Sequence, residues 1–173
     1  MKKILLTLII SLGFIGTVNA AWTDAHDKAY SAFEDGDYQK AFEGFSTLAK
    51  TGDIDAQEWL AYMYSEGLGV SQDYNQVFNW HLKAANQGSQ YSQDSLGLLY
   101  YYGNGVAQDY KKAISWHLKA ASQGYIDAQN NLGYIYTNDV GVAQDYKQAV
   151  NWYRKAAYQG DSEGQNNLGV MYE

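Results

Sequence analysis

The side chains of this sequence best suited to metal chemistry are its three histidines. His81 and His117 stand 36 residues apart at one position of an internal repeat, where Tyr153 follows them. Equivalent residues of a repeat array lie along its length instead of converging, and no His-Glu-x-x-His motif is present. We therefore expect no metal centre here, and we predict that both histidines pack as aromatic-like residues of a helix.

Closely spaced acidic and glycine residues are further candidates for ligand sites. Asp35-Gly36-Asp37 and Asp53-Ile54-Asp55 each bring two carboxylates together, but neither continues into a twelve-residue calcium loop with a closing Glu. Both are typical of turns and helix starts. Gly103-Asn104-Gly105 lacks the third glycine and the preceding strand of a nucleotide site. The sequence predicts no cofactor.

Nucleophilic catalysis has little support in the sequence. A serine β-lactamase needs Ser-x-x-Lys and Ser-Asp-Asn, and neither occurs. Lys50-Thr51-Gly52 does occur, at the predicted end of a helix. There a lysine favours the negative end of the helix dipole, and a glycine can cap the helix. We interpret this tripeptide as structural and expect the chain not to be an enzyme.

The elements that position these residues follow from a repeat of 36 residues. Residues 89–124 and 125–160 share 18 identities in an alignment without gaps. The period is seen in Gly52, Gly88, Gly124 and Gly160, in Tyr38, Tyr74, Tyr110 and Tyr146, and in Trp80, Trp116 and Trp152. A fixed period of this length indicates a solenoid of stacked units.

Each unit is predicted to hold two helices, called here helix A and helix B. Helix A should begin near Asp55, Tyr91, Asp127 and Glu163, and it carries Leu-Gly-x-x-Tyr in three units. Glycine inside a helix costs about 1 kcal/mol, so its recurrence predicts a neighbouring helix in close contact. Helix B should begin after a Gly-rich loop at Asp73, Asp109 and Asp145 and end at Gln-Gly, where the glycine adopts a left-handed conformation. Asp139-Val140 replaces the first loop glycine of the third unit, so we expect that loop to bend differently.

The ordered motifs resemble the Sel-one-like repeat (SLR), a relative of the tetratricopeptide repeat (TPR). They are Ala-x-x-x-Leu-Gly-x-x-Tyr, Gly-x-Gly-Val-x-x-Asp-Tyr-x-x-Ala and Trp-x-x-Lys-Ala-Ala-x-x-Gly. The resemblance implies an all-α, right-handed solenoid of stacked antiparallel helix pairs. We divide the chain into a TPR-like capping hairpin (21–52), three SLR units (53–88, 89–124 and 125–160) and helix A of a fourth unit (161–173).

Residues 1–20 are predicted to be a signal peptide. Lys2 and Lys3 precede an apolar run that is shorter than the roughly 20 residues of a membrane span, and Val18-Asn19-Ala20 suits a signal peptidase. We therefore expect export to the periplasm or beyond, without a membrane anchor. Loss of Lys2 and Lys3 takes the net charge from −7 to −9, which disfavours binding to nucleic acid.

The resemblance also implies a function, which is binding of a protein or peptide on the concave face formed by the A helices. Tyrosine and tryptophan are favoured anchors for such contacts, and the carboxylates favour a basic or neutral partner. The alternative is a hydrolase that acts on the cell wall or on β-lactams, as linked to cysteine-rich SLR proteins; a third reading is a structural piece of a larger assembly. The predicted partner-binding residues are Asp55, Glu58, Trp59, Tyr62, Tyr91, Asp94, Leu98, Tyr101, Tyr102, Asp127, Asn130, Asn131 and Tyr134.

Overall fold

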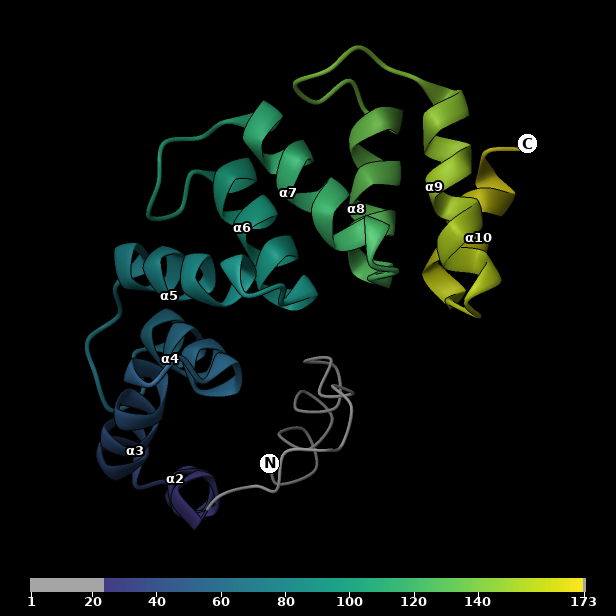
Figure 1. The fold of residues 1–173 in the computed structure, drawn as a ribbon. Coiled ribbons are helices and arrows are strands. Elements are labelled where there is room, and N and C mark those ends of the chain that lie inside the picture. Colours follow the sequence, from purple (N-terminus) through teal and green to yellow (C-terminus); the bar gives the residue numbers. More distant parts are fainter. Residues whose placement is uncertain (1–23, 173) are drawn as a thin grey trace.

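The computed structural model describes residues 24–172, so the predicted signal peptide lies outside the described part of the chain. Within this range the chain forms nine α-helices and no strand, which confirms the predicted all-α solenoid (Figure 1). The helices are α2 (Asp24–Glu34), α3 (Tyr38–Lys50), α4 (Ile54–Glu66), α5 (Tyr74–Asn86), α6 (Gln90–Tyr102), α7 (Tyr110–Ser122), α8 (Ile126–Thr137), α9 (Tyr146–Tyr158) and α10 (Ser162–Val170).

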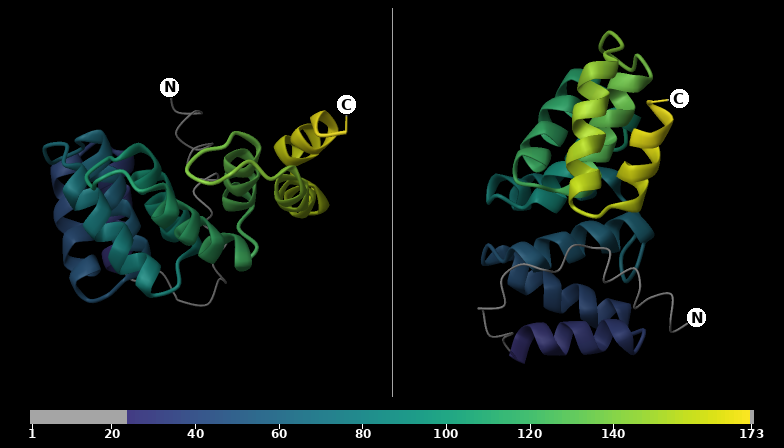
Figure 2. Two further views of the ribbon diagram at one scale, coloured as in Figure 1. Left: turned by 90° about the horizontal axis from the view of Figure 1, so that it is seen from above. Right: turned by 90° about the vertical axis from the view of Figure 1, so that its right-hand side faces the viewer.

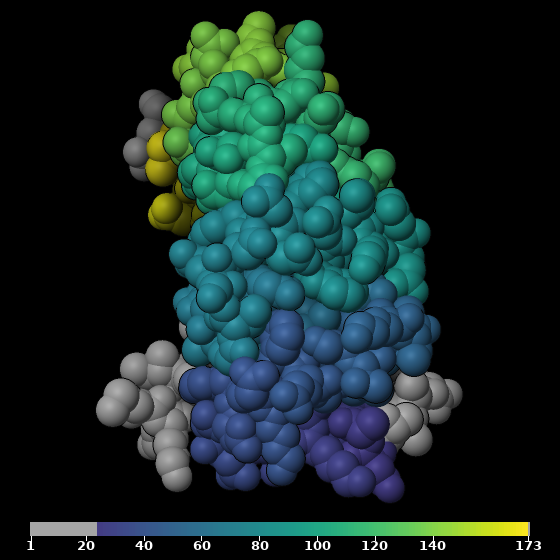
Figure 3. All heavy atoms as spheres, turned by 90° about the vertical axis from the view of Figure 1, so that its left-hand side faces the viewer, coloured from purple at the N-terminus to yellow at the C-terminus, as the bar shows by residue number. Residues whose placement is uncertain are grey.

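Consecutive helices pack against each other along the whole chain, and the stack follows an arc (Figure 1). The two further views in Figure 2 show the same order, from the N-terminal hairpin to α10. Seen from the left of Figure 1, the helices from α2 upward form one continuous surface (Figure 3). Helices α4, α6, α8 and α10 are the A helices of the units, and α5, α7 and α9 are the B helices.

Side-chain caps set the starts of the three B helices and of α4, α6 and α10, whereas α8 begins after Tyr125 without a side-chain cap. Asp73, Asp109 and Asp145 are the N-caps of the three B helices, as predicted. The A helices begin one residue earlier than expected. Asp53 is the N-cap of α4 and accepts a hydrogen bond from the backbone N–H of Ala56 at 2.8 Å, so Asp55 lies in the first turn instead. A cap oxygen satisfies backbone donors that the helix leaves unpaired.

The loop between helices A and B depends on close contact with the preceding unit. A Cβ atom on Gly105 would lie 2.1 Å from the carbonyl oxygen of Tyr74, at the start of α5. Asp139 holds a left-handed backbone with φ 55°, close to the φ of 75° at the equivalent Gly103. The different bend expected for the third loop is therefore absent at this residue.

The glycine of Leu-Gly-x-x-Tyr has the close neighbour that its position predicts. A Cβ atom on Gly97 would lie 2.5–2.7 Å from three ring atoms of His117, and one on Gly133 would meet the ring of Tyr153 as closely. The neighbour is in each case helix B of the same unit. His117 is 1% exposed and His81 is 6% exposed, so both are buried on helix B as predicted.

A pair of glutamine side chains in each unit bonds to backbone carbonyls of the preceding helix, and no sequence motif predicted these glutamine pairs. Gln93 of α6 donates to the carbonyl oxygen of Ala85 at 3.2 Å, and its own Oε1 accepts from Gln123 of α7 at 2.8 Å. The same pattern recurs one unit before and one unit after, through Gln57 with Gln87 and Gln129 with Gln159. These buried amides satisfy the polar groups at the end of helix B.

We expect the loop contact at Gly105 to be a strong determinant of stability. Gly105→Ala should lower the free energy of unfolding by about 3 kcal/mol, because it adds a backbone clash to the cost of a left-handed alanine. Gly88→Ala is the matched control, since Gly88 has a φ of 100° and no atom within 4 Å of an added Cβ; it should cost about 1–2 kcal/mol. Urea unfolding measures both, and equal losses would contradict the prediction.

Candidate partner-binding face

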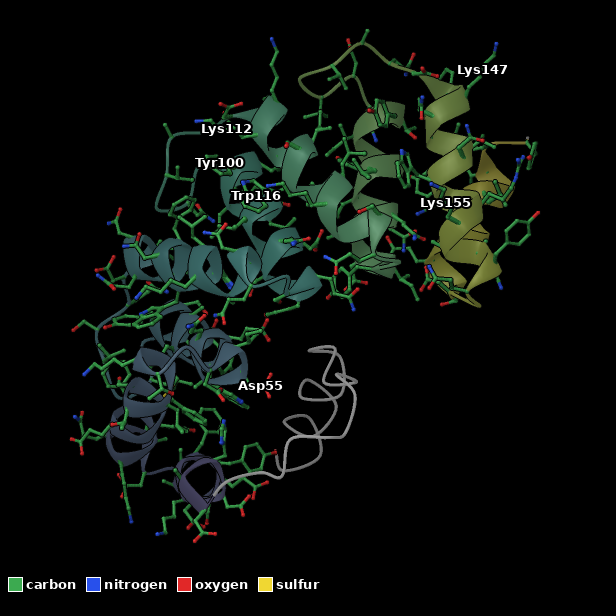
Figure 4. All side chains as sticks on the ribbon, in the orientation of Figure 1. Asp55, Tyr100, Lys112, Trp116, Lys147 and Lys155 are labelled. Atoms are coloured by element: carbon green, nitrogen blue, oxygen red, sulfur yellow. The ribbon has the colours of Figure 1, made fainter. Side chains whose placement is uncertain are left out.

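The predicted binding residues lie on α4, α6 and α8, and their exposure differs widely. Asp55, Asp127, Leu98, Tyr102 and Tyr134 are exposed, the last three at 36%, 64% and 51%. Glu58, Tyr62, Tyr91, Tyr101 and Asn131 are half-buried. In Figure 4 Asp55 lies on the inner side of the arc, whereas Lys112 and Lys147 lie at its outer edge. We call the accessible side of α4, α6 and α8 the A-helix face.

Trp59 does not present its ring on this face. It is 4% exposed and stacks on Phe45 with ring centroids 5.2 Å apart and an interplanar angle of 7°. Phe33 of the capping hairpin covers it further, at 4.8 Å. Trp59 therefore joins the hairpin to the first unit as part of the core, which corrects its assignment as a partner contact.

Glu58 connects three helices through two serines. The hydroxyls of Ser89 and Ser92 both donate to its Oε1, the latter at 3.0 Å. Because Ser92 spends its proton on Glu58, its Oγ must accept from Nδ1–H of His81, which lies 3.1 Å away on α5. Burial raises the pKa of Glu58 to about 7 against the opposing effect of the serine hydrogen bonds, and burial alone lowers the pKa of His81 to about 4.

Asp94 is the centre of a second buried group one unit further along. Its Oδ1 lies 2.6 Å from Nδ1 of His117, and the amide of Asn131 donates to its two oxygens at 3.1 and 3.3 Å. The His117 ring reaches Asp94 because it lies flat against Gly97. This carboxylate therefore receives donors from α7 and α8 and fixes the orientation of both side chains.

The three units differ at the glycine of helix A and at the histidine of helix B. Ala61 replaces the glycine in the first unit, and His81 there bonds to Ser92 of the next unit instead of to its own helix A. Tyr153 takes the place of the histidine in the third unit, and its hydroxyl bonds to Thr137. Asn130 there donates to Asp161 at 2.8 Å, and its own Oδ1 is buried without a donor.

A small cavity opens beside the Asp94 group. It has a volume of about 40 Å³. Tyr101 and Tyr102 contact each other edge to face at 4.9 Å, and the Tyr101 hydroxyl is hydrogen-bonded to that of Tyr134. The structure thus brings five of the predicted binding residues together, although no motif spacing indicated a cavity. Its lining consists of Leu98, Tyr101, Tyr102, His117, Asn131, Tyr134 and Ile135.

Charge is divided between the two helix types. Helices α4, α6, α8 and α10 contain no Lys or Arg, whereas α5, α7 and α9 contain no Asp or Glu. Lysines of the B helices lie over tryptophan rings, as Lys119 does over Trp116 at 3.6 Å. Asp127 is exposed as a residue, but partial desolvation of its carboxyl group raises its pKa, and the charges of Asp94 and Asp161 raise it further against the hydrogen bond from Tyr125. The A-helix face therefore collects carboxylates without basic residues of its own helices.

The other motifs that resembled chemical sites are structural. Lys50 ends α3, and the Thr51 hydroxyl donates to the carbonyl oxygen of Leu48 at 2.7 Å, which confirms the helix-end interpretation. Over residues 24–172, no three His, Cys, Asp or Glu side chains gather as a metal-binding group. In the same part of the chain, no helix is long and apolar enough to cross a membrane.

The raised pKa of Glu58 predicts a pH-dependent stability. Its folded pKa of about 7 exceeds the ordinary 4.5, so its contribution is fully present below pH 4.5 and is lost as the pH rises through 7. Glu58→Gln keeps the acceptor but has no proton to lose. It should be more stable than the native chain by about 1 kcal/mol at pH 8, with the difference vanishing near pH 4.

Urea unfolding across this pH range measures the effect, with Glu43→Gln on the exposed side of α3 as the control. A native and a Glu58→Gln curve that stay parallel from pH 4 to pH 8 would contradict a protonation coupled to folding.

Comparisons with known proteins agree with this architecture. The Sel1 repeat family matches residues 54–89, 90–125, 126–161 and 162–173. No curated protein matched the chain. A crystal structure of a protective antigen of uropathogenic Escherichia coli with an SLR fold is 35% identical, with a TM-score of 0.80 over 86% of this chain and 33% of that one.

Two further solved structures are similar. A Sel1 repeat protein from Oxalobacter formigenes is 32% identical, with a TM-score of 0.76 over 87% of this chain and 60% of that one. Cysteine-rich protein B of Helicobacter pylori is 24% identical, with a TM-score of 0.55 over 83% and 96%, and shows the fold alone. The chain thus spans a third and 60% of the first two relatives. With the family matched from residue 54 onward and the same solenoid in its relatives, the chain belongs to the Sel1 repeat family of the TPR-like superfamily.

Proposed function

We propose that this protein is a non-catalytic scaffold that binds a protein or peptide on its A-helix face. The observation that carries the proposal is the group of Leu98, Tyr102 and Tyr134, which are exposed on α6 and α8 around one cavity. Exposed aromatic and aliphatic side chains that gather on one surface are typical of binding sites. Sel1 repeat proteins are generally helical scaffolds without catalytic activity, which supports the same conclusion.

The shape of the face favours a partner that spans several units. The cavity of about 40 Å³ holds the end of one side chain and is far smaller than a pocket for a whole small molecule. Half-buried polar residues, among them Glu58, Tyr91 and Asn131, belong to the groups around His81 and His117. An extended chain laid across α4, α6 and α8 would meet alternating carboxylate, amide and tyrosine groups.

The second candidate function is a hydrolase directed at the cell wall or at β-lactams, and the Asp94–His117 pair is the observation in its favour. A carboxylate that orients a histidine is a common arrangement for a general base. The side chains that line the cavity include no Ser, Thr, Cys or Lys, so none of them is a usual nucleophile for His117 to activate. Asn131 also donates to Asp94. The scaffold proposal therefore expects no turnover of a chromogenic β-lactam by the purified chain. Turnover that His117→Gln abolishes would favour the hydrolase instead.

We also propose that the protein is exported and acts in the periplasm or outside the cell. Lys2, Lys3, the following apolar run and Val18-Asn19-Ala20 support this location. Mass spectrometry of the protein from a cell envelope fraction would test it, and the expected N-terminus is Ala21. A chain that keeps Met1 and stays in the cytoplasmic fraction would contradict export.

A pull-down with matched variants tests the binding face. The A-face variant combines Leu98→Ala, Tyr102→Ala and Tyr134→Ala, and the B-face variant combines Leu118→Ala, Tyr146→Ala and Tyr158→Ala. The residues changed are exposed at 36%, 64% and 51% in the first and at 37%, 53% and 84% in the second. A partner should be retained from envelope extract by the native chain and the B-face variant and lost with the A-face variant. Its affinity should fall about 100-fold, the sum of two or three anchor losses.

Circular dichroism must show that both variants are folded. Retention by the A-face variant, or loss only with the B-face variant, would place binding elsewhere on the solenoid.

A further inference from the structure

The cavity between α6 and α8 has a chemical character that narrows the class of partner. This inference rests on the proposed function and goes one step further, to the side chain that occupies the cavity. Its polar lining consists of His117, Asn131 and the tyrosine hydroxyls, and Asp94 lies behind the first two of these.

Asp94 accepts hydrogen bonds from both His117 and Asn131, so these donors are not available to a ligand. Nδ1–H of His117 donates to the carboxylate, and so does the amide N–H₂ of Asn131. In the neutral ring, Nε2 is then a lone-pair acceptor, and no hydrogen bond to it is present among the described residues. The Oδ1 atom of Asn131 is likewise left as an acceptor. Of the polar groups that line the cavity, His117 and Asn131 therefore favour a ligand that donates hydrogen bonds, and the tyrosine hydroxyls can accept from it as well.

His117 presents a hydrogen-bonding atom to the cavity. Its side chain is only 1% exposed, yet it lines the cavity, and its Nε2 makes no hydrogen bond among the described residues. A donor that enters the cavity can therefore pair with this nitrogen.

The surroundings favour a positive charge on that donor. Asp94 is a carboxylate directly behind the cavity. Burial first, and then the negative charges of Asp127 and Asp94, raise the pKa of Tyr125. Helices α4, α6 and α8 supply no Lys or Arg to balance these charges. Tyr101, Tyr102 and Tyr134 place aromatic rings around the opening, and aromatic faces attract cations.

The size of the cavity favours lysine over arginine as the cationic side chain that enters it. A volume of about 40 Å³ accommodates a few water-sized groups, since one water needs roughly 10–15 Å³ on this measure. An ammonium group is compact, whereas a guanidinium is a wide planar fork. Leu98 and Ile135 line the rest of the cavity and suit the methylenes of a lysine stem.

We propose that the cavity between α6 and α8 binds the ammonium group of a lysine side chain presented by the partner. The ammonium donates to Nε2 of His117 and Oδ1 of Asn131, and it lies within the field of Asp94. The tyrosines at the opening cover the stem of the lysine.

Defined peptides test this without knowledge of the natural partner. The probe is a library of blocked heptapeptides with uncharged residues around a fixed central lysine, and the matched libraries carry Nε-acetyl-lysine, norleucine or arginine at that place. Titrations of the isotope-labelled chain followed by NMR locate binding and give its affinity. The lysine library should shift the side-chain signals of Asn131 and His117. The acetylated and norleucine libraries should bind about 10-fold more weakly, and arginine should fall between them and lysine.

Variants separate the cavity from general attraction by charge. Tyr134→Leu should weaken the lysine library about 3- to 10-fold and leave the norleucine library unchanged. Tyr146→Leu is the control, because Tyr146 is 53% exposed on α9 and Tyr134 is 51% exposed on α8. Equal losses in the two variants would overturn the proposal.

The remaining outcomes distinguish this proposal from the proposed function. If all four libraries shift the A-helix face with equal affinity, the lysine site is wrong and the binding face stands. If the arginine library binds more tightly than the lysine library, the assignment to lysine is wrong. If no library shifts the NMR signals of α6 and α8, the lysine site is wrong. The pull-down variants then test independently whether the A-helix face binds a partner.

Discussion

The contact between a small residue in the middle of helix A and a ring on helix B is the constraint on which this structure depends. Gly97 lets the ring of His117 lie flat on α6, with ring atoms closer than any Cβ would permit. This approach brings Nδ1 within 2.6 Å of Asp94. Without this approach His117 would not line the cavity beside Asn131 in its present position. One missing methyl group thus determines both the distance between two helices and the polar character of the surface above them.

The two sides of this contact explain why similar repeats present unequal surfaces. On helix A, Ala61 replaces the glycine in the first unit, and the His81 ring there bonds to Ser92, which donates to Glu58. On helix B, Tyr153 replaces the histidine in the third unit and packs on Gly133, and Asn130 there donates to Asp161. Core residues repeat because every unit must stack on an identical neighbour. The helix A residue equivalent to Asp94 and the helix B residue equivalent to His117 differ between units, and these differences give each stretch of the face its own hydrogen-bonding pattern.

Local patterns in the sequence were enough to predict the helices, the Asp caps of the B helices and the near neighbour of Gly97, because each depends on residues within one unit. Contacts between units were harder to predict. Trp59 lies on helix A, where the resemblance predicted partner contacts, and nothing local to it reveals that Phe33 and Phe45 cover its ring. The cavity likewise requires the distance between α6 and α8, which no periodicity contains. The recurring Gln-Gly is the visible signal for the glutamine pairs, but the same two residues also mark the end of helix B, and that role alone explains their recurrence in the sequence.

The glutamine pairs have a consequence for how proteins of this kind change length. Gln123 donates to Gln93 of its own unit and to the carbonyl oxygen of Gly88 in the unit before, and Gln159 does the same with Gln129 and Gly124. Because the pair lies within one 36-residue unit and its partners in the neighbour are backbone carbonyls, a unit can be duplicated or deleted without leaving an unpaired group at the seam. The distance between two polar groups of the A-helix face therefore changes by one whole unit at a time, and the geometry within each unit is kept. Gene duplication within such an array would extend the reach of the binding surface without redesigning its core.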